Sequence, residues 1–329
     1  AGAPKFPQWS FFWLLWRGAI RSGDHQALGA VDVTLANICQ GGIYDHLGGG
    51  FARYSTDERW LVPHFEKMLY DNALLARTYL EAYQVTKRAS YRQVTMESLD
   101  YILLEMTDSA GGFYSATDAD SEGVEGKFFV WTPAEVQAVL QNAEDTRRFC
   151  ACYDITDQGN WEHRNIPNRL RPIEAVLKEL NLTIDELNET ISRVRPLLYR
   201  ARQTRVPPGL DDKIITAWNG MLISAMAEAG RVLGIKRYID GAMKAADFLL
   251  LVHRTSEGTL LRTSRQGRAH LDGVLEDYAY LAEGLVDLYE ACGQERYLTT
   301  ALQLGERMVN SFQDKDQGGF YTTATTHET

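Results

Sequence analysis

Cysteine is scarce in this chain, with four residues among 329, Cys39, Cys150, Cys152 and Cys292, at scattered positions. Small secreted domains that depend on disulfides carry far more cysteine, so the composition argues against a disulfide framework and favours a reducing compartment such as the cytoplasm. Cys150 and Cys152 form a C-x-C pair, but a zinc site would need a second Cys or His cluster. We predict no redox centre, no metal and no other cofactor.

Positive charge and long apolar runs are also in short supply. The net charge is -10, and no run of Lys or Arg exceeds two residues, which argues against nucleic-acid or anionic-membrane partners. The apolar segment Trp9–Trp16 is too short to span a bilayer, and Arg17 closes it without a small-residue cleavage site. We interpret it as the first core helix.

Common catalytic signatures are missing as well. The chain has no G-x-S-x-G, no G-x-x-x-x-G-K-[ST] and no G-x-G-x-x-G that opens a helix after a strand. These absences disfavour a serine-hydrolase elbow and phosphate cradles for nucleotides. What is present is 45% hydrophobic and 24% charged residues, enough for one large core, so we expect residues 1–329 to form a single domain.

A repeat becomes visible when the chain is aligned with itself. Three segments of 25 residues, Lys67–Tyr91, Ile214–Tyr238 and Gly273–Tyr297, each end in a short polar turn followed by Tyr. A second helical stretch follows each, and then a glycine turn with a β-like run, which starts at Gly111, Gly258 or Gly318. The repeating unit is therefore helix, short turn, helix and long glycine loop.

The two helices of a unit differ in character. The first is apolar nearly all round, as expected for an inner helix, whereas the second has one apolar stripe, as expected for an outer helix. Hairpins are predicted at about 8–40, 64–107, 133–203, 213–253 and 274–312. The sequence thus predicts an all-α (α/α)6 toroid of six hairpins, incomplete in this chain because the last hairpin is absent, with short β-hairpins in the long loops on one face.

Several motifs resemble those of one known family. They are GAPKFP, GGIYDHLGGGFARYSTDERWLVPHFEKMLYDNALL, GGFYSATDADSEG, LDDKIITAWNGM and GVLEDYAYL. The chain closely resembles the helical part of the thioredoxin-domain-containing YyaL family, which includes a mammalian spermatogenesis-associated homologue. The resemblance implies a fold similar to six-hairpin glycosidases and N-acylglucosamine 2-epimerases. It also implies a thioredoxin-like domain upstream, which would be a partner of this domain.

The segment from Gly41 to Leu75 combines six glycines with side chains that can bind hydroxyls or transfer protons. We predict that His64 transfers a proton and that Asp45 or Glu66 orients it or acts as the opposing group. Arg53 would bind an anionic or carbonyl oxygen of the substrate. A hydrogen-bonded structural histidine is the equally weighted alternative for His64.

Further ligand-binding residues are expected on the face that carries the glycine loops and the N-termini of the inner helices. Free N–H groups at helix N-termini favour carboxylates and hydroxyl oxygens, although a first-turn acid is often only a cap. The residues at these helix starts are Asp71, Asn72, Asp212, Asn219, Glu276, Asp277 and Tyr278. Trp60, Trp131 and Trp218 are candidate sugar-stacking rings, and each is alternatively part of the core.

Asp118, Asp120 and Glu122 have a calcium-like D-x-D-x-E spacing. The EF-hand loop requires a Gly at its sixth position and a terminal Glu in register, and Gly123 and Glu125 are out of place. We therefore predict no metal, and expect Asp118 and Asp120 to line the mouth of the pocket or to hold the hairpin that follows.

These expectations favour a small polar ligand, such as a sugar, in a pocket on the loop-rich face. Two reactions remain open: a sugar epimerase or isomerase would use His64, whereas a glycosidase would use two carboxylates. A protein of another class also remains open, namely a non-catalytic scaffold that recognises glycans or proteins for the thioredoxin-like domain. Because one fold hosts several chemistries, the resemblance indicates a fold more firmly than an activity.

Overall fold

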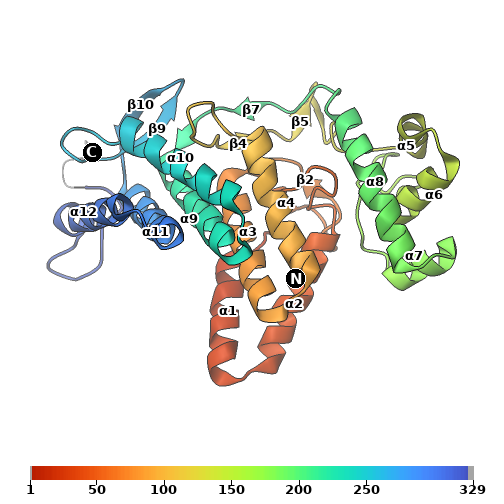
Figure 1. Ribbon diagram of the computed structural model, residues 1–329, viewed down its shortest axis with the longest axis horizontal. Coiled ribbons are helices and arrows are strands. Elements are labelled where there is room, and N and C mark those ends of the chain that lie inside the picture. Colours follow the sequence, from red (N-terminus) through yellow and green to blue (C-terminus); the bar gives the residue numbers. More distant parts are fainter. Residues whose placement is uncertain (1, 325–329) are drawn as a thin grey trace. The chain divides into compact units, whose positions relative to one another are not determined.

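The computed structural model describes residues 2–324, which are mostly helical and contain twelve helices with small antiparallel strand pairs (Figure 1). The chain divides into two compact units. Unit 1 comprises the residues up to Lys67 together with Thr117–Gly209, and unit 2 comprises Met68–Ala116 together with the residues from Leu210 onward. The expectation of a single toroidal domain stays a prediction.

Unit 1 contains six helices and two short strand pairs among its described residues. The helices are α1 (Trp9–Ser22), α2 (His25–Gln40), α5 (Pro133–Leu140), α6 (Ala143–Cys152), α7 (Ile173–Leu180) and α8 (Ile184–Arg202). The strands are β1 (Tyr54–Ser55), β2 (Pro63–His64), β5 (Asp120–Ser121) and β6 (Val124–Glu125). β1 pairs with β2, and β5 pairs with β6, both antiparallel.

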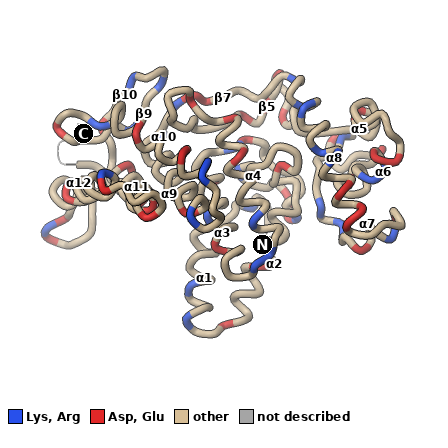
Figure 2. Tube along the Cα trace, in the orientation of Figure 1, with Lys and Arg blue, Asp and Glu red and all other residues tan. Residues whose placement is uncertain are grey.

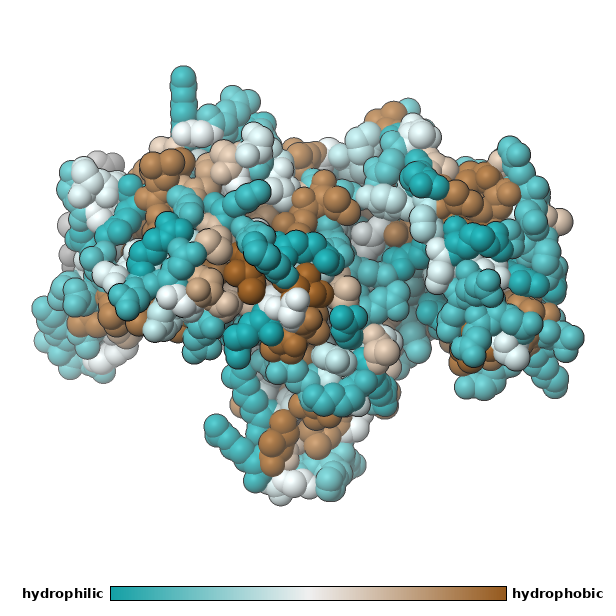
Figure 3. Space-filling model, viewed as in Figure 1, coloured by the Kyte–Doolittle hydropathy of each residue, from teal (hydrophilic) through white to brown (hydrophobic). Residues whose placement is uncertain are grey.

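The first hairpin, α1 and α2, buries one side only. Phe12 and Trp16 face inward from α1, whereas Phe11 and Leu14 are 59% and 71% exposed. Brown, hydrophobic side chains accordingly gather on the visible part of this hairpin in the space-filling view (Figure 3). Asp24 caps α2 by accepting hydrogen bonds from the backbone N–H groups of Gln26 and Ala27.

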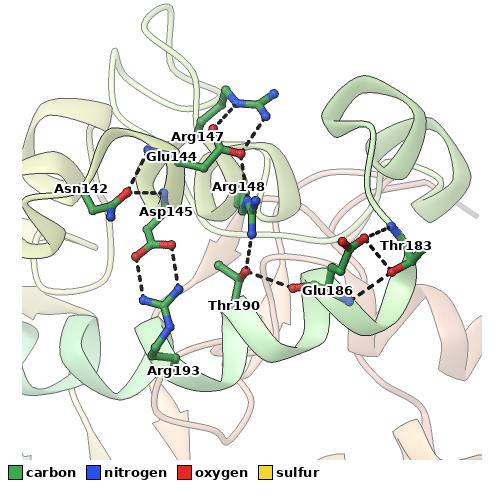
Figure 4. Close-up of polar contacts among 9 residues, drawn as sticks. All are labelled: Asn142, Glu144, Asp145, Arg147, Arg148, Thr183, Glu186, Thr190 and Arg193. Carbon is green, nitrogen blue, oxygen red and sulfur yellow. Dashed lines mark hydrogen bonds and ion pairs between the residues drawn. The ribbon is translucent and has the colours of Figure 1, made fainter.

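Helices α5 to α8 enclose a second apolar cluster built from side chains such as Phe149, Val194 and Leu198. Basic and acidic residues lie close together along α6, α7 and α8 (Figure 2). The carboxylate of Asp145 on α6 accepts hydrogen bonds from both terminal nitrogens of Arg193 on α8, at 2.7 and 2.8 Å (Figure 4). Such bidentate pairs fix the geometry of two helices better than a single surface ion pair does.

Two threonines in this region cap the first turns of helices. Thr183 begins α8 with a capping box, in which its hydroxyl accepts from the N–H of Glu186 and the Glu186 carboxylate accepts from the N–H of Thr183 (Figure 4). The reciprocal pair satisfies two N–H groups that would otherwise lack partners. Thr132 and Glu135 form the same box at α5.

Unit 2 contains three helix pairs among its described residues, and the two helices of each pair follow one another in the chain. The helices are α3 (Leu69–Thr86), α4 (Ala89–Glu105), α9 (Thr216–Leu233), α10 (Lys236–Val252), α11 (Leu275–Cys292) and α12 (Glu295–Phe312). The strands are β7 (Leu210–Asp211), β8 (Ile214–Ile215), β9 (Leu261–Arg265) and β10 (Arg268–Asp272). β8, β9 and β10 form one antiparallel sheet, and β3 (Lys67–Met68) and β4 (Ala116–Thr117) lie where the chain passes between the units.

Helix α9 packs against both α3 and α11, and each of these three helices packs against the helix that follows it (Figure 1). The side chains of α3 and α9 are buried around most of their circumference. By contrast, α12 buries a single stripe that includes Tyr297 and Leu304. First helices of the repeat therefore lie inside and second helices outside within this unit.

Charged side chains join the three inner helices. Arg77 on α3 binds Glu228 on α9 through two hydrogen bonds of 3.0 Å and Glu283 on α11 at 2.6 Å. Asp287 on α11 lies 3.9 Å from the same guanidinium and accepts a short hydrogen bond from Ser224. Burial raises the pKa of Asp287 to about 6, and Glu228 adds to the rise.

Among the described residues, no helix combines the length and the apolar character needed to cross a bilayer.

Gly220 and Gly284 allow the backbones of α9 and α11 to touch. A Cβ at position 220 would lie 2.5 Å from the carbonyl carbon of Tyr280 and 2.6 Å from the nitrogen of Leu281. A Cβ at Gly284 would lie 2.5 Å from the carbonyl oxygen of Gly220. Since the contacts are to backbone atoms, a rotamer change cannot relieve them.

We predict that Gly220→Ala lowers the free energy of unfolding by about 1–3 kcal/mol, the usual cost of overpacking, even though Ala is the better helix former. The matched control is Gly305→Ala on α12, where an added Cβ meets nothing within 4 Å. That variant should gain up to about 1 kcal/mol from helix propensity alone. Urea titrations of both variants test the prediction, and equal stability of the two would contradict it.

Candidate functional site

The segment from Pro63 to Lys67 separates two environments in unit 1. Side chains alternate between the two sides of extended backbone, so Pro63, Phe65 and Lys67 point into a small cavity. His64 and Glu66 point the other way and stay partly exposed. Pairing of β1 with β2 places Tyr54 opposite His64 and fixes this register.

His64 lies between two carboxylates. Its Nδ1 is 2.8 Å from Oε1 of Glu125, and its Nε2 is 3.9 Å from Oε2 of Glu66. The ring stacks on Tyr54, with the centroids 5.1 Å apart and the planes at 22°. The side chain of His64 is 33% exposed. It is neither sealed in the core nor bonded only to backbone, and its role in proton transfer stays a prediction.

Arg53 lies at the edge of the same cluster. Its backbone N–H donates to the carbonyl of Glu66 at 2.8 Å, and its guanidinium lies 3.4 Å from the Glu66 carboxylate. The residue is thereby held beside Glu66, and its role in binding a substrate oxygen stays a prediction. We name His64, Glu66, Glu125 and Arg53 the His64 cluster.

Asp45 is not part of the His64 cluster. Its carboxylate is buried and binds Lys67 and Arg202, each at 2.8 Å, and Oδ1 also accepts the N–H groups of Leu47 and Gly48. Burial alone would raise the pKa of Asp45, but Arg202 and Lys67 hold it well below its usual range. The carboxylate of Asp45 therefore lies on one side of the 63–67 segment, and His64 points to the other side. The expected role of Asp45 in orienting His64 is therefore not supported, and Glu125 takes that position.

Reasoning from the sequence missed Glu125, Tyr54, Lys67 and Arg202. Glu125 reaches His64 from the β5–β6 hairpin, where it pairs with Asp120. Because side chains alternate along extended backbone, the sequence could have predicted that Lys67 and His64 point to opposite sides of the 63–67 segment. No local pattern could have placed a residue 61 positions away beside the histidine.

Two of the expected stacking tryptophans lie inside unit 1. Trp60 is 5% exposed and has Lys5 over its ring at 4.3 Å. Trp131 is 2% exposed and is covered by Arg205 at 4.0 Å. Because their ring faces are covered, we retain neither as a sugar platform.

Asp118 lies in the loop that leads into the β5–β6 hairpin, and Asp120 is the first residue of β5. Oδ1 of Asp118 accepts the N–H of Ala119 at 2.6 Å, so this side chain shapes its own turn. Asp120 is exposed. Within residues 2–324, no group of three or more His, Cys, Asp or Glu side chains is arranged to hold a metal ion.

Two of the expected ligand-binding residues in unit 2 form hydrogen bonds with the backbone. Asn219 accepts the N–H of Phe113 at 2.8 Å and donates to its carbonyl at 3.0 Å. Asp277 accepts the N–H of Ala217 at 3.0 Å and that of Val274 at 2.9 Å. Burial raises the pKa of Asp277 to about 6.

The remaining candidates of unit 2 differ in accessibility. Buried members are Asp71, Asn72, which donates to the carbonyl of Met68, and Tyr278, which accepts the N–H of Leu260. Partly exposed members are Trp218, whose ring packs on Tyr70, Asp212, which pairs with Arg265, and Glu276, which pairs with Arg262. Only this second group could meet a ligand without rearrangement.

Comparison with known proteins agrees with the resemblance seen in the motifs. No protein-family model matches the chain. Human spermatogenesis-associated protein 20 is 36% identical over 358 residues, which cover 98% of this chain and 46% of the human protein. Uncharacterized protein B0495.5 of Caenorhabditis elegans is 30% identical over 338 residues, and the aligned region covers 92% of this chain and 46% of the worm protein.

The chain is a homologue of spermatogenesis-associated protein 20. It spans about half the length of the curated relatives it matches. Identity to the mouse protein, 34% over 359 residues, supports the same conclusion.

Solved structures with low sequence identity share the fold. The unsaturated glucuronyl hydrolase of Bacillus sp. GL1 aligns with a TM-score of 0.56 and 13% identity over 94% of this chain and 64% of that chain. A family 105 glycoside hydrolase of Clostridium acetobutylicum aligns with a TM-score of 0.55 and 12% identity over 93% and 63%. The predicted α/α toroid fold class is confirmed.

Buried His46 gives unit 1 a measurable pH dependence. Burial lowers the pKa of His46 to about 4, nearby Arg169 adds to the effect, and the Nε2–H donates to the carbonyl of Gly41 at 2.9 Å. In the unfolded chain the ring binds its proton near pH 6.5. Between about pH 4 and pH 6.5 the unfolded chain therefore binds a proton that the folded protein does not bind, so that a fall in pH favours unfolding.

We predict that the contribution of His46 to stability is complete above pH 6.5 and is lost as the pH falls towards 4, by roughly 3 kcal/mol in total. The variant His46→Gln keeps a donor for Gly41 but does not titrate, so its unfolding free energy should fall less steeply over this range. The exposed His25→Gln is the control. Identical slopes for the wild type and His46→Gln, measured by urea unfolding, would contradict the assignment.

Proposed function

We propose that this chain is the toroidal part of a carbohydrate-active enzyme that moves a proton beside a sugar carbonyl, an epimerase or isomerase, with His64 as the proton-transfer group. The observation that supports it most is the 2.8 Å contact between His64 Nδ1 and Glu125. A carboxylate at one ring nitrogen holds the proton there and leaves the other nitrogen as the base.

The His64 cluster can supply each part of such a reaction. Nε2 of His64 would remove the proton from the carbon next to the carbonyl. The electron pair of that C–H bond would form a C=C bond to the carbonyl carbon, and the π pair of the C=O bond would move to the oxygen. Arg53 would stabilise the resulting enolate oxygen, as cationic groups do where charge develops. Glu125 would stabilise the imidazolium. The proton would return to the carbon from His64 itself, or from Glu66 after Glu66 had taken a proton from solvent and while His64 released its own to solvent.

A glycosidase is the second candidate, and the fold neighbours support it. The hydrolases that share the fold act by name on glycosides, which also supports a sugar as ligand. A glycosidase needs two carboxylates that face each other across about 5–9.5 Å with the substrate between them. In the His64 cluster, the imidazole occupies the space between Glu66 and Glu125. This arrangement favours proton transfer by histidine.

A non-catalytic role is the third candidate. The thioredoxin-like domain implied by the sequence resemblance would be the partner of the toroid in a longer protein, and a reducing compartment such as the cytoplasm would suit the scattered cysteines. In that case the exposed His64 cluster would bind a glycan or a protein without changing it. Absence of turnover together with sugar binding would favour this role.

The proposal predicts proton exchange with solvent. In heavy water, a panel of reducing mono- and disaccharides should contain a substrate that gains deuterium at the carbon next to its carbonyl, as followed by proton NMR. His64→Gln should lower the exchange rate by about 100-fold or more, the usual contribution of a general acid or base, with little change in sugar affinity. Glu125→Gln should also slow exchange, since the ring would lose its orienting charge.

The matched control is Glu122→Gln. Glu122 belongs to the same β5–β6 loop but pairs with Lys127, at 2.7 Å, so its exchange rate should equal that of the wild type. Full activity of His64→Gln would rule out the proposed role. Release of reducing ends from a glycoside without deuterium incorporation would support the glycosidase instead.

A further inference from the structure

A groove on the surface of unit 1 has no part in the reaction proposed above. Its volume is about 490 Å³, within the range of about 300–1,000 Å³ that is typical of ligand pockets. Residues from the N-terminal segment 2–8, from α1 and α2, and from segment 58–60 line it. All of them belong to unit 1.

Two ring contacts connect this groove to His64. Phe6, which lines the groove, has its ring centre 4.7 Å from that of Tyr54, and the ring centre of Tyr54 is 5.1 Å from that of His64. The ring centre of Phe6 is therefore at most 9.8 Å, the sum of these two distances, from that of His64. The groove and the His64 cluster are thus close enough for one extended ligand to contact both.

The backbone that carries Phe6 is held in place. Lys5 pairs with Ser55 of β1 through backbone hydrogen bonds of 2.8 and 2.9 Å. The ammonium group of Lys5 donates to the carbonyl of Glu58 at 2.9 Å and lies 4.3 Å from the ring centre of Trp60. The N-terminal segment is therefore attached to the strand that also sets the register of His64. A wall fixed before binding lowers the cost of ordering it around a ligand.

The wall of the groove combines apolar surface with hydrogen-bonding groups. Phe6 is 43% and Val33 is 62% exposed. Gln8, Glu58 and Arg59 also line the groove and are exposed, and within residues 2–324 their side chains form no hydrogen bond or ion pair. Together these three side chains donate and accept hydrogen bonds, as sugar hydroxyls do. The apolar face of a sugar ring packs on an aromatic ring much as another ring does.

We propose that this groove binds the second sugar unit of the substrate, which is then an oligosaccharide whose reducing-end unit meets His64. The inference rests on the proposed function, because it takes the reacting carbonyl to lie at the His64 cluster. The second unit packs on Phe6, and its hydroxyls bind Gln8, Glu58 and Arg59. A monosaccharide leaves the groove unused and therefore binds less tightly.

The test compares sugars that share a reducing end. Maltose, cellobiose and lactose each end in glucose, so the rate of deuterium exchange gives a ratio of kcat/KM for each disaccharide to kcat/KM for glucose. In the wild type, at least one ratio should be about 10 or more. Phe6→Ala should lower that ratio by about 3- to 10-fold, the usual contribution of one aromatic stacking contact. The ratio cancels any change that affects both sugars equally.

A second variant and a control complete the comparison. Val33→Trp introduces a bulky ring at an exposed position of α2 that lines the groove, so it should lower the same ratio. It decides the question if Phe6→Ala does not fold. Phe11→Ala removes a 59% exposed ring of α1 that does not line the groove, and its ratio should equal that of the wild type.

Calorimetric titration with the same sugars separates failure of this inference from failure of the proposed function. Exchange with equal ratios and equal affinities in the wild type, Phe6→Ala and Val33→Trp would overturn the groove assignment and leave proton transfer by His64 intact. The groove would then suit a protein segment better than a sugar. Disaccharide binding that both variants weaken, without exchange, would keep the groove as a sugar site and count against proton transfer. Absence of disaccharide binding would overturn the groove assignment whatever the exchange result.

Discussion

The ion pairs of Asp45 with Lys67 and Arg202 are the interaction on which unit 1 depends most. They join the glycine loop, the segment that carries His64 and the C-terminal end of α8, three parts of the chain that are far apart in sequence. A buried carboxylate that lost one of these partners would leave unpaired charge in the interior, at a cost of about 3–5 kcal/mol. Because Lys67 is anchored on one side of an extended segment, His64 and Glu66 must project on the other. The position of the His64 cluster is thus a consequence of a structural ion pair that makes no contact with it.

In unit 2, one position of the 25-residue repeat binds the backbone of a glycine loop. Asn219 and Tyr278 occupy equivalent places in their 25-residue repeats, and each binds the backbone of the preceding glycine loop, at Phe113 and Leu260 respectively. Phe113 and Leu260 are themselves equivalent positions in those loops. An inner helix therefore fastens the glycine loop that follows the preceding helix pair of its unit. This explains why polar residues recur at the helix starts without requiring that they meet a ligand, and it leaves Trp218, Asp212 and Glu276 as the accessible candidates of that unit.

The helical content and the pairing of helices could be predicted from the sequence, because the apolar pattern and the polar turn recur with a fixed period. Residues 67–91, for example, contain all of α3 and the start of α4. The region rich in proline was less predictable: α8 continues through Pro196, since packing of Val194 and Leu198 outweighs the lost hydrogen bond. For the site, motif composition pointed to His64, Glu66 and Arg53. The partner Glu125 and the separation of Asp45 could not be predicted, because both depend on how distant segments pair.

The fold and the chemistry of this protein are supported by different kinds of observation. Likeness to glycoside hydrolases at 12–13% identity concerns the helix framework, and a framework of this type hosts several reactions. The His64 cluster, in contrast, is observed directly in this chain: a histidine between two carboxylates, beside an arginine, on a segment whose register is fixed by β1. The buried His46, by contrast, bonds to a single backbone carbonyl. The contrast between these two histidines of one unit supports the proposal that His64 transfers a proton, and the exchange measurement on His64→Gln tests it.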